Sequence, residues 1–192
     1  LSRGLGDVYK RQAINGGAKN IVNEKIATNA NTQTEIMNLD DAIALGAEAM
    51  FDEKYENESK NKEVSKIIIK DNIYQIRKVL SEHIVDDAVD AVIISGGTGI
   101  TGSDGTPEAV IPLLDKIIDG FGEIFRLKSY EKIKTSSLQS RALEGVANKT
   151  FIFVLPGSID ACTTAWESII SQQLNSETKP CNLVMLMPRL NE

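Results

Sequence analysis

The sequence predicts an α/β protein with a mainly parallel sheet. Two apolar runs of strand length, residues 91–94 and 150–155, are each followed by a loop that contains glycine and then by a segment that begins like a helix. Such strand–loop–helix units are typical of parallel sheets, in which the loops after the strands lie at one rim. The length of 192 residues allows one sizeable domain of this class.

Composition argues against several function classes. The net charge of −6 and an aromatic content of 5% do not fit a nucleic-acid surface, which needs basic patches interleaved with stacking rings. No apolar run reaches the length of a membrane span, and the first residues do not read as a signal peptide. We therefore expect a soluble, cytoplasmic protein that binds neither nucleic acid nor membrane. His83 is the only histidine and is expected to be a solvated or half-buried helix residue rather than a zinc ligand, while Cys162 and Cys181 are expected to be buried thiols.

Residues 1–60 differ in character from the rest of the chain. Residues 1–12 follow neither the helix nor the strand period and resemble translated adapter sequence. Residues 56–66 are rich in Glu, Asn, Ser and Lys, which is the composition of a linker. We therefore expect two regions, residues 1–60 and residues 61–192, of which the first is a small α+β fragment foreign to the second.

Residues 21–55 resemble part of the editing region of alanyl-tRNA synthetase. The resemblance rests on three segments in order, namely Val22-Asn-Glu-Lys-Ile26, Thr34-Glu-Ile-Met37 and the run from Ala42 to Tyr55. That family hydrolyses mischarged tRNA at a zinc ion held by a His-x-x-x-His pair and a later Cys and His. None of these zinc motifs occurs in this sequence, so the resemblance does not carry the editing chemistry with it.

The second region begins with a strand and a helix. Residues 67–69, three isoleucines, predict a strand that Asp71 ends. The helix is predicted from apolar residues that recur at helical spacing: Ile73, Ile76, Leu80 and Ile84.

The strand at residues 91–94 leads into the stretch that organises the chain, which we call the glycine loop (residues 96–105). Glycines at positions 96, 97 and 99 allow positive φ and let a ligand approach the backbone amides, an arrangement that suits phosphate. Asp104 would repel a bare phosphate, so its presence suggests a bridging Mg²⁺. A purely structural interpretation is also open, because glycines can merely turn the chain, and Thr106, Pro107 and Glu108 suit the cap, the first position and the dipole of a helix.

A second junction of the same kind lies further along the chain. Residues 150–155 are the strongest predicted strand, and Pro156, Gly157 and Ser158 form what we call the second loop, with Ser158 as the cap of the next helix and Asp160 in its first turn. On the rim of a parallel sheet this loop would face the glycine loop. Residues 179–188 are predicted to form a last strand.

Helical spacing also predicts which residues between and after these junctions are buried. The expected core residues are Phe121, Ile124, Phe125, Trp166, Ile169, Ile170 and Leu174. Arg126 and Arg141 are the cations nearest in sequence to a substrate site, although a solvated helix face is the alternative for each.

The string from Val92 to Ala109 closely resembles the MoaB/Mog family of molybdenum-cofactor biosynthesis proteins. The shared pattern is an apolar run, Ser-Gly-Gly-Thr-Gly, four residues, Asp, and then Thr-Pro-Glu-Ala, and further segments between about residues 66 and 188 resemble the family in order. The resemblance implies a three-layer α/β/α domain, binding of molybdopterin, Mg²⁺-dependent transfer of AMP from ATP to the molybdopterin phosphate, and a homo-trimer or hexamer.

The resemblance also implies site residues. Asp71 and Asp104 would hold Mg²⁺ and serve catalysis. The residues that would bind substrate are Ser95, Gly96, Gly97, Thr98, Gly99, Thr106, Pro107, Glu108, Ser140, Arg141, Pro156, Gly157 and Ser158.

Three departures from the family pattern leave the function open. Ser103 stands where the family usually has Arg, Asp160 stands where it usually has Gly, and the central first strand of the family is replaced by the synthetase-like fragment. We therefore expect a sheet without its first strand and two regions that did not evolve together. The open functions are a molybdopterin adenylyltransferase, a non-catalytic molybdopterin-binding or scaffold protein, and a tRNA-editing fragment, which predicts zinc and binding to charged tRNA.

Overall fold

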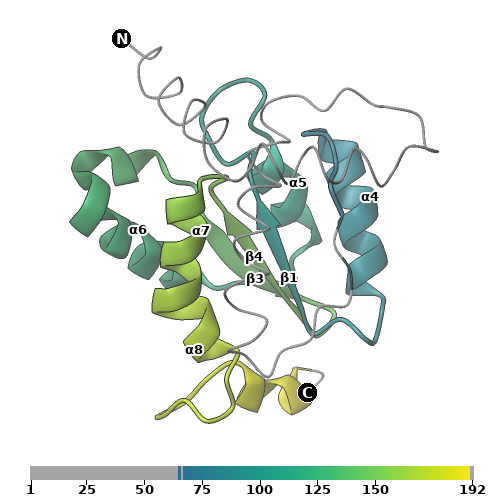
Figure 1. The fold of residues 1–192 in the computed structure, drawn as a ribbon. Helices are drawn as coiled ribbons and strands as arrows, with labels where there is room; N and C mark the ends of the chain where they lie inside the picture. Colours follow the sequence, from purple (N-terminus) through teal and green to yellow (C-terminus); the bar gives the residue numbers. More distant parts are fainter. Residues whose placement is uncertain (1–64, 66, 191–192) are drawn as a thin grey trace, which may run out of the picture.

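The structure, a computed structural model, describes residue 65 and residues 67–190. A four-stranded sheet lies between two sets of helices, with α4 and α5 over one face and α6, α7 and α8 over the other (Figure 1). The predicted α/β class and three-layer architecture are confirmed. The adapter-like residues 1–12, the synthetase-like segment at 21–55 and the predicted boundary near residue 60 lie outside the described residues.

The sheet is mixed rather than mainly parallel. Its strand order is β1-β4-β3-β2, with bounds Ala91–Ser95, Thr150–Leu155, Leu143–Ala147 and Lys116–Ile117 in that order. β1 and β4 pair in parallel, whereas the β3–β4 and β2–β3 pairs are antiparallel. Asn148 and Lys149, with φ of 44° and 78°, form the two-residue turn between β3 and β4, and this hairpin makes the sheet mixed.

β4 is one of the two inner strands and is buried along its whole length. Phe151, Phe153 and Leu155 pack on the α6–α7 side, while Ile152 and Val154 pack on the α4–α5 side. This strict alternation follows from the period of two in a strand, because both faces of β4 are covered by helices.

The helices were partly predicted. α4 spans Ile73–Ile84, as the spacing of its isoleucines predicts, and the Asn72 side chain caps it by accepting hydrogen bonds from the amides of Tyr74 and Gln75 at 3.0 and 3.1 Å. The other helical segments are α5 (Thr106–Val110), η1 (Ile111–Leu113), α6 (Asp119–Ile133), η2 (Lys134–Gln139), α7 (Ile159–Ala165), the π-helical η3 (Trp166–Ile170), α8 (Ser171–Gln173) and η4 (Val184–Arg189). None of the helices formed by described residues combines the length and apolar character needed to cross a membrane.

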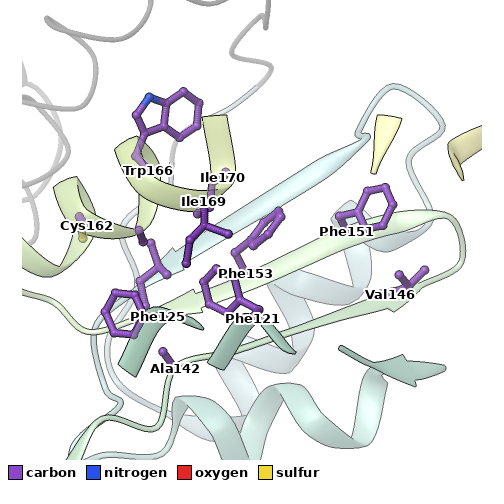
Figure 2. Packing of buried hydrophobic residues seen from close by; sticks show 12 residues of the cluster. Phe121, Phe125, Ala142, Val146, Phe151, Phe153, Cys162, Trp166, Ile169 and Ile170 are labelled. Carbon is purple, nitrogen blue, oxygen red and sulfur yellow. The ribbon is translucent and has the colours of Figure 1, made fainter. Parts of the chain in front are cut away.

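The larger core cluster lies between the sheet and the α6–α7 layer. Figure 2 shows Phe121 and Phe125 from α6 beside Phe153 from β4, under Trp166, Ile169 and Ile170. The rings of Phe121 and Phe153 meet edge to face with centroids 5.6 Å apart. The predicted core residues are buried except Leu174, which is half-buried and packs against this cluster, and Ile124, which is 48% exposed because it lies on the outer side of α6.

Two predicted strands do not form. Residues 67–69 have no regular secondary structure and pair with no strand of the described chain, and Ile67 and Ile68 are exposed. A strand needs a neighbour, and the described residues provide none on the outer edge of β1. The tail predicted as a strand at 179–188 forms no strand: its second half enters η4, and the side chain of Asn182, which precedes η4, accepts a hydrogen bond from the amide of Met185 at 3.0 Å.

The burial of the two cysteines and of the histidine was also predicted from the sequence. Cys162 is buried as expected, but Cys181 is exposed, since the turn before η4 lies at the surface. His83 is half-buried near the end of α4, as predicted, and hydrogen bonds link its ring to the Val79 carbonyl and the Ser65 hydroxyl at 2.8 and 2.7 Å.

Glu144 on β3 is a buried carboxyl group in an apolar setting. It is 3% exposed, lies opposite Phe153 in the β3–β4 register, and its Oε1 atom has no hydrogen-bond partner among the described residues. Burial raises the pKa of Glu144 to about 8, because the charged form is poorly solvated there. In the unfolded chain this group ionises near 4.5, so between these two pH values folding keeps a proton that unfolding releases.

Glu144 should therefore make the protein less stable as the pH rises. The contribution of Glu144 to the free energy of unfolding is fully favourable below about pH 4.5. It falls by about 1.4 kcal/mol per pH unit up to about pH 8. We predict that Glu144→Gln raises the free energy of unfolding at pH 8 relative to the parent and removes this slope, as measured by urea unfolding from pH 5 to 8.5. Glu123→Gln, on the exposed side of α6, is the matched control and should leave the slope unchanged. An equal slope in Glu144→Gln and the parent would contradict the prediction.

Candidate functional site

The candidate site is the rim of the sheet where β1 and β4 end. The parallel register pairs Ser95 with Leu155, so the glycine loop and the second loop leave the sheet side by side. The amide of Gly96 donates to the Leu155 carbonyl at 3.0 Å, and a Cβ on Gly157 would lie 3.2 Å from the Gly96 Cα. The predicted meeting of the two loops is confirmed.

The glycine loop turns sharply at Gly96 and Gly97, whose φ angles are 109° and 61°. Gly97 also packs so closely that a Cβ there would collide with the Thr106 hydroxyl and lie 2.7 Å from Asp71 Oδ2. The Thr106 amide donates to the Gly97 carbonyl at 3.0 Å, which closes the loop onto the start of α5. Gly97 is thus required both by its backbone conformation and by the close approach of its neighbours.

The start of α5 differs by one residue from the prediction. Gly105, not Thr106, is the N-cap, and no side chain caps the helix. Thr106 and Pro107 are its first residues and are buried, while Glu108 lies in its first turn and is exposed. Thr98 is also buried, so the side chains of Thr98, Thr106 and Pro107 support the loop from beneath.

The two predicted acidic residues, Asp71 and Asp104, flank the glycine loop. Asp71 lies beside Gly97, and Asp104 lies beside Gly99, where a Cβ would be 2.5 Å from Asp104 Oδ2. Burial and, after it, the negative charge of Asp104 raise the pKa of Asp71 above its usual value, while a hydrogen bond from the Gly105 backbone opposes this rise. The structure therefore brings the two carboxylates close enough to interact electrostatically.

Asp104 is held in its ionised form. Burial alone would raise its pKa, but the pKa is lowered overall because the side chain and amide of Thr101, the amide of Gly99 and the charge of Arg141 favour the carboxylate. The Thr101 hydroxyl and amide donate to Asp104 Oδ2 at 2.6 and 2.9 Å. Thr101 was not predicted as a site residue, although Asp side chains in loops often accept a hydrogen bond from the amide three residues earlier.

Arg141 enters the site from the segment between η2 and β3. Its guanidinium donates to the carbonyls of Thr98 and Asp104, each at 3.2 Å, and forms an ion pair with Glu108. This contact lowers the pKa of Glu108, chiefly through the hydrogen bond from Arg141. The hydroxyl of Ser140, the predicted neighbour of Arg141 in the site, accepts a hydrogen bond from the Ala142 amide at 3.4 Å. Arg126, the other cation considered, donates to the Ala142 carbonyl on the α6 side of the sheet.

The second loop is fixed by the first turn of α7. Ser158 is the N-cap as predicted, and its hydroxyl accepts a hydrogen bond from the Ala161 amide at 3.3 Å. Cys162, which sequence reasoning did not connect with the site, lies under both loops, with its Sγ 3.4 Å from the Pro156 carbonyl and 3.2 Å from the Ser95 hydroxyl. The position of Cys162 one helical turn after Ser158 was the sequence signal that could have connected it with the site.

A cavity of about 280 Å³ lies at the other end of the strands. It is bounded by the end of α4, the β3–β4 turn and η4, and it includes none of the predicted site residues. The candidate site is instead an open rim formed by backbone and by paired side chains.

Comparison with known proteins agrees with this geometry. Residues 54–176 match the sequence profile of the family described as the probable molybdopterin binding domain. The chain belongs to this family. The family assignment confirms the resemblance carried by the glycine loop, and it places the two loops described above inside a molybdopterin-binding domain.

Individual relatives of this molybdopterin-binding domain carry related names. Molybdenum cofactor biosynthesis protein B of Escherichia coli (strain K12) is 56% identical over 119 residues, which is 62% of this chain and 70% of the relative. The crystal structure of a molybdenum cofactor biosynthesis protein B is 33% identical, covers 84% of this chain and 90% of its own, and has a TM-score of 0.66. The tungsten cofactor synthesizing protein MoaB from Pyrococcus furiosus is 30% identical, with 75% and 84% covered and a TM-score of 0.61.

The packing of Gly97 in this molybdopterin-binding domain gives a direct test of the loop. We predict that Gly97→Ala lowers the free energy of unfolding by about 2 kcal/mol or more, because the added Cβ collides with Thr106 and sits in a left-handed conformation. Gly102→Ala is the matched control in the same loop, because a Cβ there meets no described atom within 4 Å, and it should change stability by no more than about 0.5 kcal/mol. Urea unfolding measures both, and equal stabilities for the two variants would contradict the packing argument.

Proposed function

We propose that this chain binds molybdopterin and transfers AMP from ATP to the molybdopterin phosphate in a Mg²⁺-dependent reaction. The observation that carries the proposal is the pair of interacting carboxylates, Asp71 and Asp104, on either side of a glycine loop that meets the second loop at one rim. The family description and the names of the relatives support a substrate from molybdenum-cofactor biosynthesis.

The donor set at the rim fits Mg²⁺. Magnesium prefers oxygen ligands and is usually held by one or two carboxylates together with substrate phosphates and water. Asp71 and Asp104 supply the two carboxylates, and no cluster of three or more acidic, histidine or cysteine side chains suited to a metal occurs among the described residues. When bound there, the ion would neutralise charge on the phosphates of ATP.

The reaction that we propose is a displacement at the α-phosphorus of ATP. An oxygen of the molybdopterin phosphate attacks that phosphorus, a new P–O bond forms, and the bond to the bridging oxygen of pyrophosphate breaks. In such a reaction the protein contributes position and charge rather than covalent chemistry.

The protein groups at the rim have separate parts in this proposal. The amides of Gly97 and Thr98 are used by no hydrogen bond between described residues, so they are donors for a phosphate oxygen. Ser95, Gly96 and Gly99 shape that loop, and Pro156, Gly157 and Ser158 line the facing side. Ser140 stays a predicted substrate contact.

The non-catalytic alternative, a molybdopterin-binding or scaffold protein of the same fold, is favoured by one observation. Ser103 replaces a cation expected from the family, and the cation that does reach the loop, Arg141, is engaged by Glu108 and two carbonyls. A site of this kind would hold the substrate phosphate less tightly, because charge-assisted hydrogen bonds are the stronger ones.

Asp71→Asn and Asp104→Asn separate the two functions. We predict that each lowers the rate of adenylyl transfer about 100-fold or more, because several kcal/mol of charge stabilisation is lost and each 1.4 kcal/mol is tenfold in rate. The measurement uses ATP labelled at the α-phosphate with molybdopterin as acceptor. Asp87→Asn, on a side chain that is 93% exposed at the other end of the sheet, is the matched control and should keep full activity. Binding of molybdopterin without labelled product in the parent protein would favour the scaffold alternative.

We also propose that the chain forms a homo-oligomer, as predicted, through the outer face of α6 and η2. The exposed apolar residues of this face are Ile124, Leu127, Tyr130, Ile133 and Leu138. So many large apolar side chains on one stretch of surface are typical of a surface that is covered in an assembly. This face also accounts for the position of Ile124, which the periodicity of α6 alone would bury.

Leu127→Glu tests the assembly. Leu127 is 62% exposed, so its replacement should not disturb the fold but should place a charge in an apolar interface and shift the protein toward the monomer. Analytical ultracentrifugation at micromolar concentration gives the mass. Tyr74→Glu is the matched control, because Tyr74 is 77% exposed on α4 at the other face of the molecule, and its mass should equal that of the parent. A monomeric parent protein would refute the proposed assembly.

A further inference from the structure

Arg141 contacts the glycine loop at both of its ends. Its Nε atom donates to the carbonyl of Thr98, and its Nη2 atom donates to the carbonyl of Asp104. Its Nη1 atom pairs with Glu108, one turn into the segment that follows the loop. The guanidinium thereby spans the stretch from Thr98 to Glu108 within the described structure.

These three contacts need the shape of an arginine. The guanidinium is planar and presents its donors in a fixed fork, so it can bond two carbonyls and a carboxylate at once, which the single ammonium of a lysine does less well. Arg141 is half-buried, with 30% of its side chain exposed, whereas the side chain of Glu108 is 52% exposed. Glu108 therefore acts as the outer anchor of the arginine.

We infer that Arg141 is a positioning residue that holds the glycine loop closed, with Glu108 as its anchor, so that Asp104 stays across the loop from Asp71. The consequence for catalysis rests on the proposed function, but the closure of the loop does not. Sequence reasoning assigned Arg141 and Glu108 direct contacts with substrate. The geometry assigns both an indirect role, because three of the five donors of Arg141 are already directed at the protein.

The state of Asp104 agrees with this role. Its Oδ2 atom is held by Thr101, whose carbonyl in turn accepts a hydrogen bond from the Asp104 amide at 3.1 Å. The charge of Arg141 is one of the causes that lower the pKa of Asp104. Loss of Arg141 would remove this charge and the hydrogen bond from its Nη2 atom to the Asp104 carbonyl.

Hydrogen exchange of the protein alone tests the closure. In Arg141→Gln, the amides of Thr101, Asp104 and Thr106 should exchange about tenfold faster than in the parent, because charge-assisted hydrogen bonds are lost and 1.4 kcal/mol is a factor of ten. The Asp104 carboxyl, followed by carbon-detected NMR during a pH titration, should ionise at a higher pH. Arg126→Gln is the matched control, a half-buried arginine that donates to a backbone carbonyl away from the loop, and it should change neither reading.

Two further variants separate charge from shape. Arg141→Lys should keep much of the effect on the Asp104 titration, because the charge remains, but should lose the protection of the loop amides, because the fork is gone. Glu108→Gln should speed loop exchange less than Arg141→Gln does, and the double variant should exchange no faster than Arg141→Gln alone, since both act through one contact.

One outcome of these experiments would overturn the inference. If Arg141→Gln leaves loop exchange and the Asp104 titration as in the parent but weakens the binding of ATP or pyrophosphate, Arg141 is a substrate ligand and the inference is wrong. These readings need no turnover. A parent protein that makes no adenylylated product would therefore overturn the proposed function while the exchange data still decide the role of Arg141.

Discussion

The parallel pairing of β1 with β4 is the constraint on which the site depends. It fixes Ser95 opposite Leu155, so the two loops must leave the sheet in contact, and the contact is so close that a Cβ on Gly157 would lie 3.2 Å from the Gly96 Cα. Because both faces of β4 are packed with different side chains, this pairing cannot slip by one residue without moving Phe151, Phe153 and Leu155 from the α6–α7 side to the α4–α5 side, where smaller residues pack. The packing of the core and the position of the loops are therefore set by the same interaction.

The close packing around the glycine loop also determines the pKa values of the two carboxyl groups at the rim. Two carboxylates lie beside one loop, and they are not equivalent, since the pKa of Asp104 is lowered and the pKa of Asp71 is raised. Asp104 has donors from the loop itself and the charge of Arg141, whereas the burial of Asp71 has only a backbone hydrogen bond from Gly105 to oppose it. A divalent cation would relieve the repulsion that remains between the two carboxylates, which is the role that the proposed function gives to Mg²⁺.

The sequence predicted the parts of the structure whose signals are local. The helix Ile73–Ile84, the strand Thr150–Leu155, the cap at Ser158 and the meeting of the two loops follow from periodicity, capping chemistry and the rule for strand ends. β3 was missed, because Glu144 and Gly145 break its apolar pattern and the turn at Asn148-Lys149 lacks the glycine that usually marks such a hairpin. Long-range contacts could not be predicted from the sequence either. The place of Cys162 under both loops and the three bonds of Arg141 depend on tertiary packing that spacing along the chain does not encode.

The unpaired segment before α4 bears on how Asp71 is placed. Ser95 is positioned by the end of β1. Asp71 is not positioned in this way, because residues 67–69 do not join the sheet of the described chain. It is located by its neighbours instead: the capped start of α4 at Asn72, the close approach of Gly97 and the backbone hydrogen bond from Gly105. Two of these three contacts come from the glycine loop. The closure of that loop consequently sets the position of both carboxylates, directly for Asp104 and through Gly97 and Gly105 for Asp71, so the geometry of the acidic pair depends on the loop more than on the sheet.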